Sequence, residues 1–155
     1  MPLITETQKS VIQEFDARLM RHGIRYAVIG GLAAMAWGSE RPLDDLDVRI
    51  GRTDIQTVLD THRHSVSREL LPYRTEHWKI HVAQIILRGV KVDLQQAEDS
   101  QVTGAGGTYA FPDEIAFVEK DIEGLLLPIM PRDQLIAYKQ ALSRPQDLAD
   151  LAAIG

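Results

Sequence analysis

The chain has 155 residues, a formal net charge of −5 and no cysteine. The lack of cysteine excludes disulfide frameworks and thiolate metal sites, and the negative charge offers no broad basic field to nucleic acid. The N-terminal stretch MPLITETQKS lacks the regions of a signal peptide, and no apolar run approaches the roughly 20 residues that a membrane helix needs. We therefore expect a single domain over residues 1–155 that works in the cytoplasm, away from membranes.

The chain opens with a predicted helix, strand and second helix. Thr5, with Gln8 three residues later, has the pattern of a capping box, and helical spacing of apolar residues continues to Met20. The apolar run 26–29 then predicts a central strand that ends at a Gly-Gly pair. The small residues of 32–37 predict a helix packed closely behind that strand.

The next segment predicts a half-buried strand and another helix. Residues 46–50 alternate apolar and polar side chains, which is the period-two signature of a strand with one face in the core. Thr53 and Gln56 have the spacing of a second capping box, and they predict a helix that ends near His62.

The middle of the chain predicts a β-hairpin followed by a loop. Residues 80–87 and 90–95 form its two strands, on either side of a turn around Arg88-Gly89. The segment 100–113 is rich in glycine and contains a proline, so it favours an irregular loop.

The last third predicts two short strands and two helices. The strands are expected at 115–118 and 125–129. One helix is expected to begin around Pro131 and Asp133, and a last one at Pro145, because proline is favoured at the first helical position. The order of elements predicts an α/β or α+β fold, with a small mixed sheet flanked by helices and two helices at the C-terminus.

Carboxylates gather on one face of two predicted strands. Asp45 and Asp47 are two residues apart, so they project to the same side of their strand, whereas Asp44 is expected to face the other way. Asp93 lies on an alternating strand of the hairpin and completes a cluster of three if the two strands are neighbours. Oxygen ligands of this kind suit Mg²⁺ or Mn²⁺ better than zinc, and two such ions can stabilise the attacking and leaving oxygens of nucleotidyl transfer.

The segment VIGGLAAMAWGSERPLDDLDV resembles the nucleotide-binding signature of the polymerase-beta-like nucleotidyltransferase superfamily, in which a Gly-Gly strand end, a helix and an Asp-x-Asp strand follow one another. More narrowly, it is similar to small bacterial nucleotidyltransferase-like proteins of toxin–antitoxin and abortive-infection systems. The C-terminal segment LIAYKQALSRPQDLADL resembles the closing pattern of the same group. The matching blocks, at about 26–50, 90–94 and 135–151, imply a nucleotidyltransferase-like fold for the whole domain.

The resemblance implies catalytic roles for the three carboxylates. Asp45 and Asp47 would bind both metal ions. Asp93 would hold the catalytic ion and help to activate the attacking hydroxyl.

The resemblance also implies nucleotide-binding roles. Gly30 and Gly31 would cradle the triphosphate. Arg41 would lie near the phosphates or brace the aspartate strand, and Lys139 would project toward the nucleotide from a C-terminal helix. Leu43 stands where the family usually has threonine, so one hydroxyl contact is expected to be missing.

The C-terminal part of the resemblance is expected to be mainly structural. It includes Arg144, Asp147 and Asp150. The last predicted helix carries two of these acids and no basic residue, which argues against direct DNA binding by the final helix pair.

Two basic residues bear on whether the site is active. Arg49 and Lys91 share predicted strand faces with Asp47 and Asp93. Ion pairs between these cations and the aspartates would occupy the place of the metal and indicate an inactive protein.

The expected function is transfer of a nucleoside monophosphate from a nucleoside triphosphate to a hydroxyl acceptor on a protein, an RNA or a small molecule, with Mg²⁺ or Mn²⁺ as cofactor. A toxin–antitoxin setting is expected from the narrower resemblance. The alternative is a catalytically inactive binding module of the same fold, which acts as an antitoxin or regulator by protein contact. The short chain favours a small helical toxin or antitoxin as partner, or a homodimer.

Overall fold

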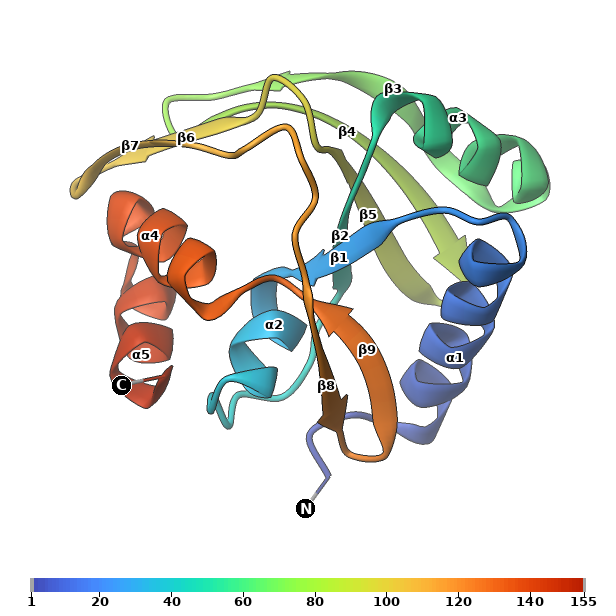
Figure 1. The fold of residues 1–155 in the computed structure, drawn as a ribbon, viewed down its shortest axis with the longest axis horizontal. Helices are drawn as coiled ribbons and strands as arrows, with labels where there is room; N and C mark the ends of the chain where they lie inside the picture. Colours follow the sequence, from blue (N-terminus) through green and yellow to red (C-terminus); the bar gives the residue numbers. More distant parts are fainter. Residues whose placement is uncertain (1, 155) are drawn as a thin grey trace.

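The computed structural model describes residues 2–154, which form a curved mixed sheet with helices packed against it (Figure 1). In chain order the elements are α1 (Glu6–Arg21), β1 (Tyr26–Ile29), α2 (Gly30–Ala36), β2 (Leu46–Ile50), α3 (Arg52–Thr61), the short 3-10 helix η1 (Arg63–Ser65), β3 (Val66–Arg74), β4 (Trp78–Leu87), β5 (Val90–Gln96), β6 (Gln101–Gly104), β7 (Gly107–Ala110), β8 (Val118–Ile122), β9 (Leu125–Ile129), α4 (Arg132–Leu142) and α5 (Pro145–Ile154). The predicted α/β architecture with two C-terminal helices is confirmed.

Within residues 2–154, the nine strands belong to one sheet in the order β7-β6-β4-β5-β2-β1-β9-β8, with β3 paired to β4. β1 pairs antiparallel with β2 and parallel with β9. β2 pairs in parallel with β5, and Asp47 of β2 is the register partner of Asp93 of β5. The Asp-x-Asp strand and the second hairpin strand are therefore neighbours, which is the arrangement that the carboxylate cluster requires.

The core lies where α1 and α2 pack on the central strands. The predicted capping box begins α1, because the Thr5 hydroxyl accepts the N–H of Gln8 and the Gln8 side chain accepts the N–H of Thr5. The same helix buries its apolar stripe of Val11, Ile12, Phe15 and Leu19. None of the helices in the described chain is long and apolar enough to cross a membrane.

The second predicted capping box is wrong. α3 begins at Arg52 after Gly51, and no side chain at the cap position bonds to it. Instead, a carboxylate oxygen of Glu98 accepts the backbone N–H of Arg52 at 3.0 Å. A residue far along the chain therefore caps this helix, in place of the local pair Thr53 and Gln56.

The predicted hairpin is present as β4 and β5. The structure also contains β3, a strand that was not predicted and that pairs with β4. Arg88 and Gly89 both have positive φ, as a two-residue type I′ turn requires. No sequence pattern predicts β3, since most of its side chains are exposed, it contains Pro72, and two irregularities interrupt its pairing with β4. Exposure on both faces removes the period-two signal.

The glycine-rich segment predicted as a loop forms the hairpin β6–β7 instead. This hairpin packs on the end of α4, and a side chain at Gly104 or Gly106 would overlap the carbonyl oxygens of Leu142 and Gln140, respectively. The N–H of Gly106 also donates to the carbonyl of Ala141 at 3.1 Å. The glycines are explained by close contact between two backbones rather than by irregular structure.

The strand expected at 115–118 lies further along the chain, as β8. The turn between β8 and β9 places Glu123 and Gly124 at positive φ and pairs Ile122 with Leu125. This turn sets the register of the hairpin, so β8 covers the residues just before it. Ile115 packs instead in a small apolar cluster with Ala27.

Two buried acids fasten α5 to the rest of the molecule. Asp147 and Asp150 are 0% and 1% exposed. Asp150 accepts hydrogen bonds from Arg41 at 2.6 Å and from Ser39, and it lies 3.0 Å from the ammonium of Lys139. Asp147 is bonded by the guanidinium of Arg144 at 2.7 Å and lies 3.4 Å from Lys139.

Replacing Asp150 with alanine is expected to lower the free energy of unfolding at pH 7 by about 3 kcal/mol, because Lys139 loses a buried partner. Burial alone would raise the pKa of Asp150, but hydrogen bonds from Arg41 and Lys139 hold this pKa below its ordinary value. The stabilisation is therefore present above the unfolded pKa and is lost as the pH falls through the folded pKa. Urea denaturation at pH 7 and at lower pH measures both effects.

The matched control is Asp60→Ala, which removes an exposed acid paired with Arg63. Because this ion pair is exposed to solvent, the change is expected to lower the free energy of unfolding much less than Asp150→Ala does at either pH. Equal losses from the two substitutions would contradict a special role for the buried acid.

Candidate active site

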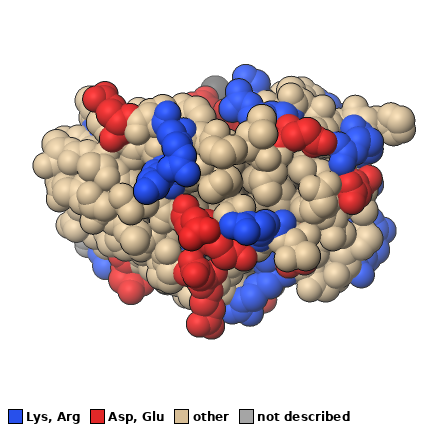
Figure 2. Space-filling view, turned by 90° about the horizontal axis from the view of Figure 1, so that it is seen from above, with Lys and Arg blue, Asp and Glu red and all other residues tan. Residues whose placement is uncertain are grey.

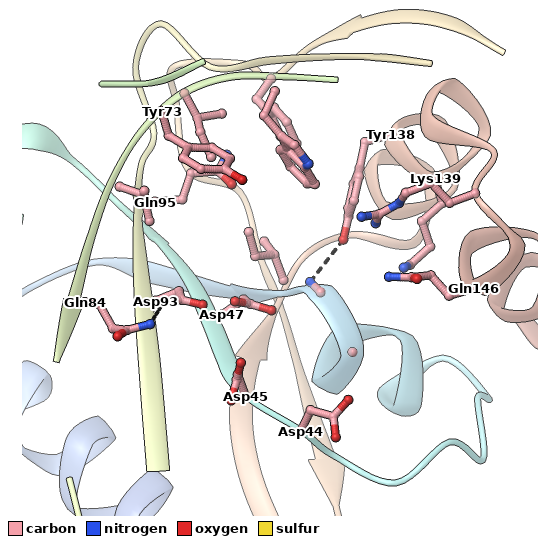
Figure 3. A pocket seen from close by; sticks show the side chains of 18 of the residues that line it. Asp44, Asp45, Asp47, Tyr73, Gln84, Asp93, Gln95, Tyr138, Lys139 and Gln146 are labelled. Carbon is pink, nitrogen blue, oxygen red and sulfur yellow. Dashed lines mark hydrogen bonds between the residues drawn. The ribbon is translucent and has the colours of Figure 1, made fainter. Parts of the chain in front are cut away.

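A cavity of about 520 Å³ opens between the carboxylate strands, the β3–β4 pair and the C-terminal helices (Figure 3). All seven residues predicted for the site line it: Gly30, Gly31, Arg41, Asp45, Asp47, Asp93 and Lys139. The structure thus brings together residues from α2, β2, β5, α4 and the segment before β2. Their chemical roles stay predictions.

Asp47 and Asp93 lie side by side at the base of the cavity, as partners in adjacent parallel strands. Burial, together with the charge of Asp93 and a hydrogen bond to it, raises the pKa of Asp47 well above its ordinary value. Burial and the charge of Asp93 also raise the pKa of Asp45. The charge of Asp93 therefore makes ionisation of Asp45 and Asp47 less favourable, and a cation between the carboxylates would relieve the repulsion.

Asp93 is held in place by two residues that no sequence pattern singled out. The side-chain amide of Gln84, its register partner in β4, donates to Asp93 Oδ1 at 2.7 Å. The hydroxyl of Ser67 in β3 donates to the amide oxygen of Gln84 at 2.8 Å. Gln84 interrupts the apolar stretch VAQIIL, which is the signal that could have identified it.

The junction of β1 and α2 requires glycine because it touches Asp47. Gly30 has φ +64°, and a side chain there would overlap the carboxylate of Asp47. Its N–H donates to the hydroxyl of Tyr138 at 3.0 Å, shown dashed in Figure 3. The N–H of Gly30 is thus committed in this structure, whereas the Cβ position of Gly31 faces open space.

Arg41 and Lys139 line the cavity, and both form ion pairs with acidic residues of α5. The guanidinium of Arg41 bonds to Asp150, and the ammonium of Lys139 lies between Asp147 and Asp150. Only 3% of the Lys139 side chain is exposed, and its role toward a nucleotide stays a prediction. Arg144, which pairs with Asp147, also lines the cavity.

The residues before β2 differ from the expectation. Asp44 is exposed at the edge of the cavity and does not face away from it (Figure 3). That prediction is wrong because β2 begins only at Leu46, so strand alternation does not extend to Asp44. Leu43 is buried in the core, which means that the residue at the usual threonine position does not line the cavity.

Neither of the two suspected cations blocks the carboxylates in the described chain. Arg49 is fully buried and turns away, donating to the backbone carbonyls of Ala97 and Pro112. Lys91 is exposed and forms no ion pair among residues 2–154. The arrangement that would have indicated an inactive site is therefore not formed.

The donor set fits a hard cation, although it is not closed around one. Among the described residues, no three His, Cys, Asp or Glu side chains lie close enough together to enclose a metal ion as they stand. Asp45 lies in the segment just before β2, two residues from Asp47 in the sequence. The crowded carboxylate oxygens of Asp47 and Asp93 suit Mg²⁺ or Mn²⁺, with Asp45 as a third ligand after side-chain rotation.

No protein-family model matches the sequence, and no curated protein matches it either. The fold, however, matches solved structures. One is a Thermotoga maritima protein provisionally assigned as a nucleotidyltransferase, with a TM-score of 0.74 and 17% identity over 97% of this chain and 94% of that chain.

Two further structures are similar over most of their length. ANT(2″)-Ia in complex with adenylyl-2″-tobramycin has a TM-score of 0.63 and 16% identity, covering 96% of this chain and 87% of that chain. An antigenic nucleotidyltransferase-like protein from Paracoccidioides brasiliensis has a TM-score of 0.56 and 16% identity, covering 99% and 78%. At such low identity these similarities establish the fold: the chain has the nucleotidyltransferase fold. The narrower resemblance to toxin–antitoxin proteins stays a prediction.

Replacing Asp47 with asparagine is expected to raise the melting temperature measured in EDTA at neutral pH, because the amide removes the repulsion from Asp93. The gain should be about 2–4 °C, the shift that roughly 1 kcal/mol produces in a chain of this size. A raised folded-state pKa contributes stability below the unfolded pKa, which is lost as the pH rises through the folded pKa. The advantage of the variant should therefore grow from acid to neutral pH.

Thermal unfolding in EDTA across this pH range measures the effect. The control is Asp44→Asn at the exposed rim, which should change the melting temperature much less. An advantage of Asp47→Asn that does not change with pH would contradict the electrostatic explanation.

Proposed function

We propose that the protein is a metal-dependent nucleotidyltransferase, which moves a nucleoside monophosphate from a nucleoside triphosphate to a hydroxyl acceptor. The observation that carries the proposal is the adjacent pair Asp47 and Asp93, crowded in a polar cavity beside Gly30 and Gly31. Two carboxylates in this position oppose folding unless a cation joins them, so the arrangement is better explained by chemistry than by stability.

The carboxylates divide the chemical tasks. Asp47 and Asp93, with Asp45, would hold Mg²⁺ or Mn²⁺, and when bound such an ion neutralises charge on the phosphate and on the attacking oxygen. Asp93, which accepts a hydrogen bond from Gln84, would take the proton of the acceptor hydroxyl. The acceptor oxygen bonds to the α-phosphorus, the bond from that phosphorus to the bridging oxygen breaks, and pyrophosphate leaves with the bridging oxygen.

The α4–α5 side of the cavity suits the triphosphate. Arg41, Lys139 and Arg144 bring three positive charges against the two negative charges of Asp147 and Asp150. This wall therefore keeps an excess of positive charge, opposite the acidic edge of the cavity. Side chains anchored in this way lose little freedom when phosphate oxygens arrive, which favours binding.

The acceptor is proposed as a class. ANT(2″)-Ia, which has a similar fold, holds adenylyl-2″-tobramycin, and this supports a hydroxyl-bearing acceptor for the present chain. We extend the proposal to a hydroxyl on a protein, an RNA end or a small molecule. A small helical partner protein or a second copy of this chain would complete the acceptor site in a toxin–antitoxin system.

Calorimetric titration of ATP, GTP, CTP and UTP in the presence of Mg²⁺ tests the proposal, and at least one nucleotide is expected to bind. The double change Asp45→Asn, Asp47→Asn should abolish Mn²⁺ binding measured by electron paramagnetic resonance and lower transfer of labelled nucleotide at least about 100-fold. The control is the double change Asp54→Asn, Asp60→Asn on α3, outside the cavity. Failure of all four nucleotides to bind would sink the proposal.

A further inference from the structure

The cavity has a second wall to which the proposed chemistry gives no role. Strand register pairs Gln95 with Val82 and Ile80 with Tyr73, so these four side chains project to the same side of β5, β4 and β3. Trp78, two residues before Ile80, shares that face. All five line the cavity, and together they are called the sheet wall here.

Gln95 has an unmet hydrogen bond on this wall. Its side chain is 5% exposed, and no residue in the described chain accepts a hydrogen bond from its Nε2. The nearby amide of Gln84 is engaged at both ends, by Asp93 and by Ser67. A buried donor without a partner destabilises the folded chain and is rare in native proteins. The orphan amide therefore marks a place where an acceptor atom from outside the chain is expected.

The surroundings of this amide are apolar and aromatic. Val82 and Ile80 separate Gln95 from Tyr73, and neighbouring strands about 4.8 Å apart place β3 about 10 Å from β5. Tyr73 is 41% exposed, and it lines the same cavity as Gln95 (Figure 3). The Trp78 ring is already covered by the guanidinium of Arg144, 5.4 Å from its centroid. A flat apolar surface with one free donor fits a planar heteroaromatic ring.

We propose that the sheet wall binds the nucleobase of the nucleoside triphosphate. The Gln95 amide donates a hydrogen bond to an acceptor atom on the edge of the base, and the Tyr73 ring stacks on its face. The proposal rests on the proposed function, which places the α-phosphate at Asp47 and Asp93. Gln95 follows Asp93 by two residues on the same face of β5, about 7 Å away, which leaves room for the ribose between them.

This placement makes Gln95 a specificity-determining residue. The phosphates lie toward Gly31 and the α4–α5 helices, and the base lies toward the sheet wall, so the nucleotide spans the carboxylates. Stacking on Tyr73 accepts any base, because every base has a flat face. Discrimination among bases comes from the hydrogen bond to Gln95, since a base that presents no acceptor there leaves the donor unpaired.

The test measures binding of the α,β-methylene analogues of ATP, GTP, CTP and UTP with Mg²⁺ by calorimetry, together with inorganic tripolyphosphate. Gln95→Leu should lower the affinity for the preferred nucleotide about 5- to 10-fold, and it should reduce the differences in affinity among the four nucleotides. Tyr73→Ala changes an exposed position, so the variant should fold, and it should lower the affinity for all four nucleotide analogues about tenfold. Tripolyphosphate should bind both variants as it binds the wild type. Gln13→Leu, exposed on α1, is the control.

Two results would overturn the inference while leaving the proposed function intact. One is a folded Gln95→Leu variant whose affinities for the four nucleotides equal those of the wild type. The other is an equal weakening of tripolyphosphate, which would place the amide at the phosphates. If the wild type binds none of the nucleotides, both the inference and the proposed function fall, so the two failures are distinguishable.

Discussion

The parallel pairing of β2 with β5 is the constraint on which the candidate site depends. It places Asp47 and Asp93 as partners across adjacent strands, where the charge of Asp93 and burial raise the pKa of Asp47. The neighbouring structure accommodates this pair: glycine at position 30 leaves room for the Asp47 carboxylate, and Gln84 supplies a donor to Asp93. The fold thus holds an electrostatically unfavourable pair in a fixed position, at a cost that the surrounding core must cover.

The charges that affect the cavity are distinguished by their burial in ion pairs and not by the number of basic residues on the surface. Basic side chains on the face shown in Figure 2 lie singly or in small groups, without one broad basic patch. The cations that matter for the cavity are instead braced by Asp147 and Asp150, inside the contact between α4 and α5. The acidic edge and the braced cations face one cavity, which gives it two sides of opposite character.

Sequence patterns predicted what local chemistry decides. The capping box at Thr5, the β4–β5 hairpin and the acidic face of β2 follow from spacing within a few residues. Predictions from local patterns were wrong where a residue far along the chain determines the structure. Glu98 caps α3 in place of a local pair, and the glycines of β6–β7 are needed because their backbone contacts the backbone of α4. The sequence did not identify Gln84 or Gln95, because their hydrogen bonding depends on residues distant in the sequence. Gln84 donates to Asp93 in the neighbouring strand, whereas the Nε2 of Gln95 has no partner in the described chain.

The glycine contacts between β6–β7 and α4 also set a dimension of the molecule. Backbone meets backbone at Gly104 and Gly106, so no side chain there can change its rotamer to adjust the spacing. β6 pairs with the start of β4, at Trp78, so this fixed spacing extends to the edge of the sheet wall. The height of the cavity between the sheet and the C-terminal helices is thus a property of the main chain, and a ligand of different thickness must be accommodated elsewhere.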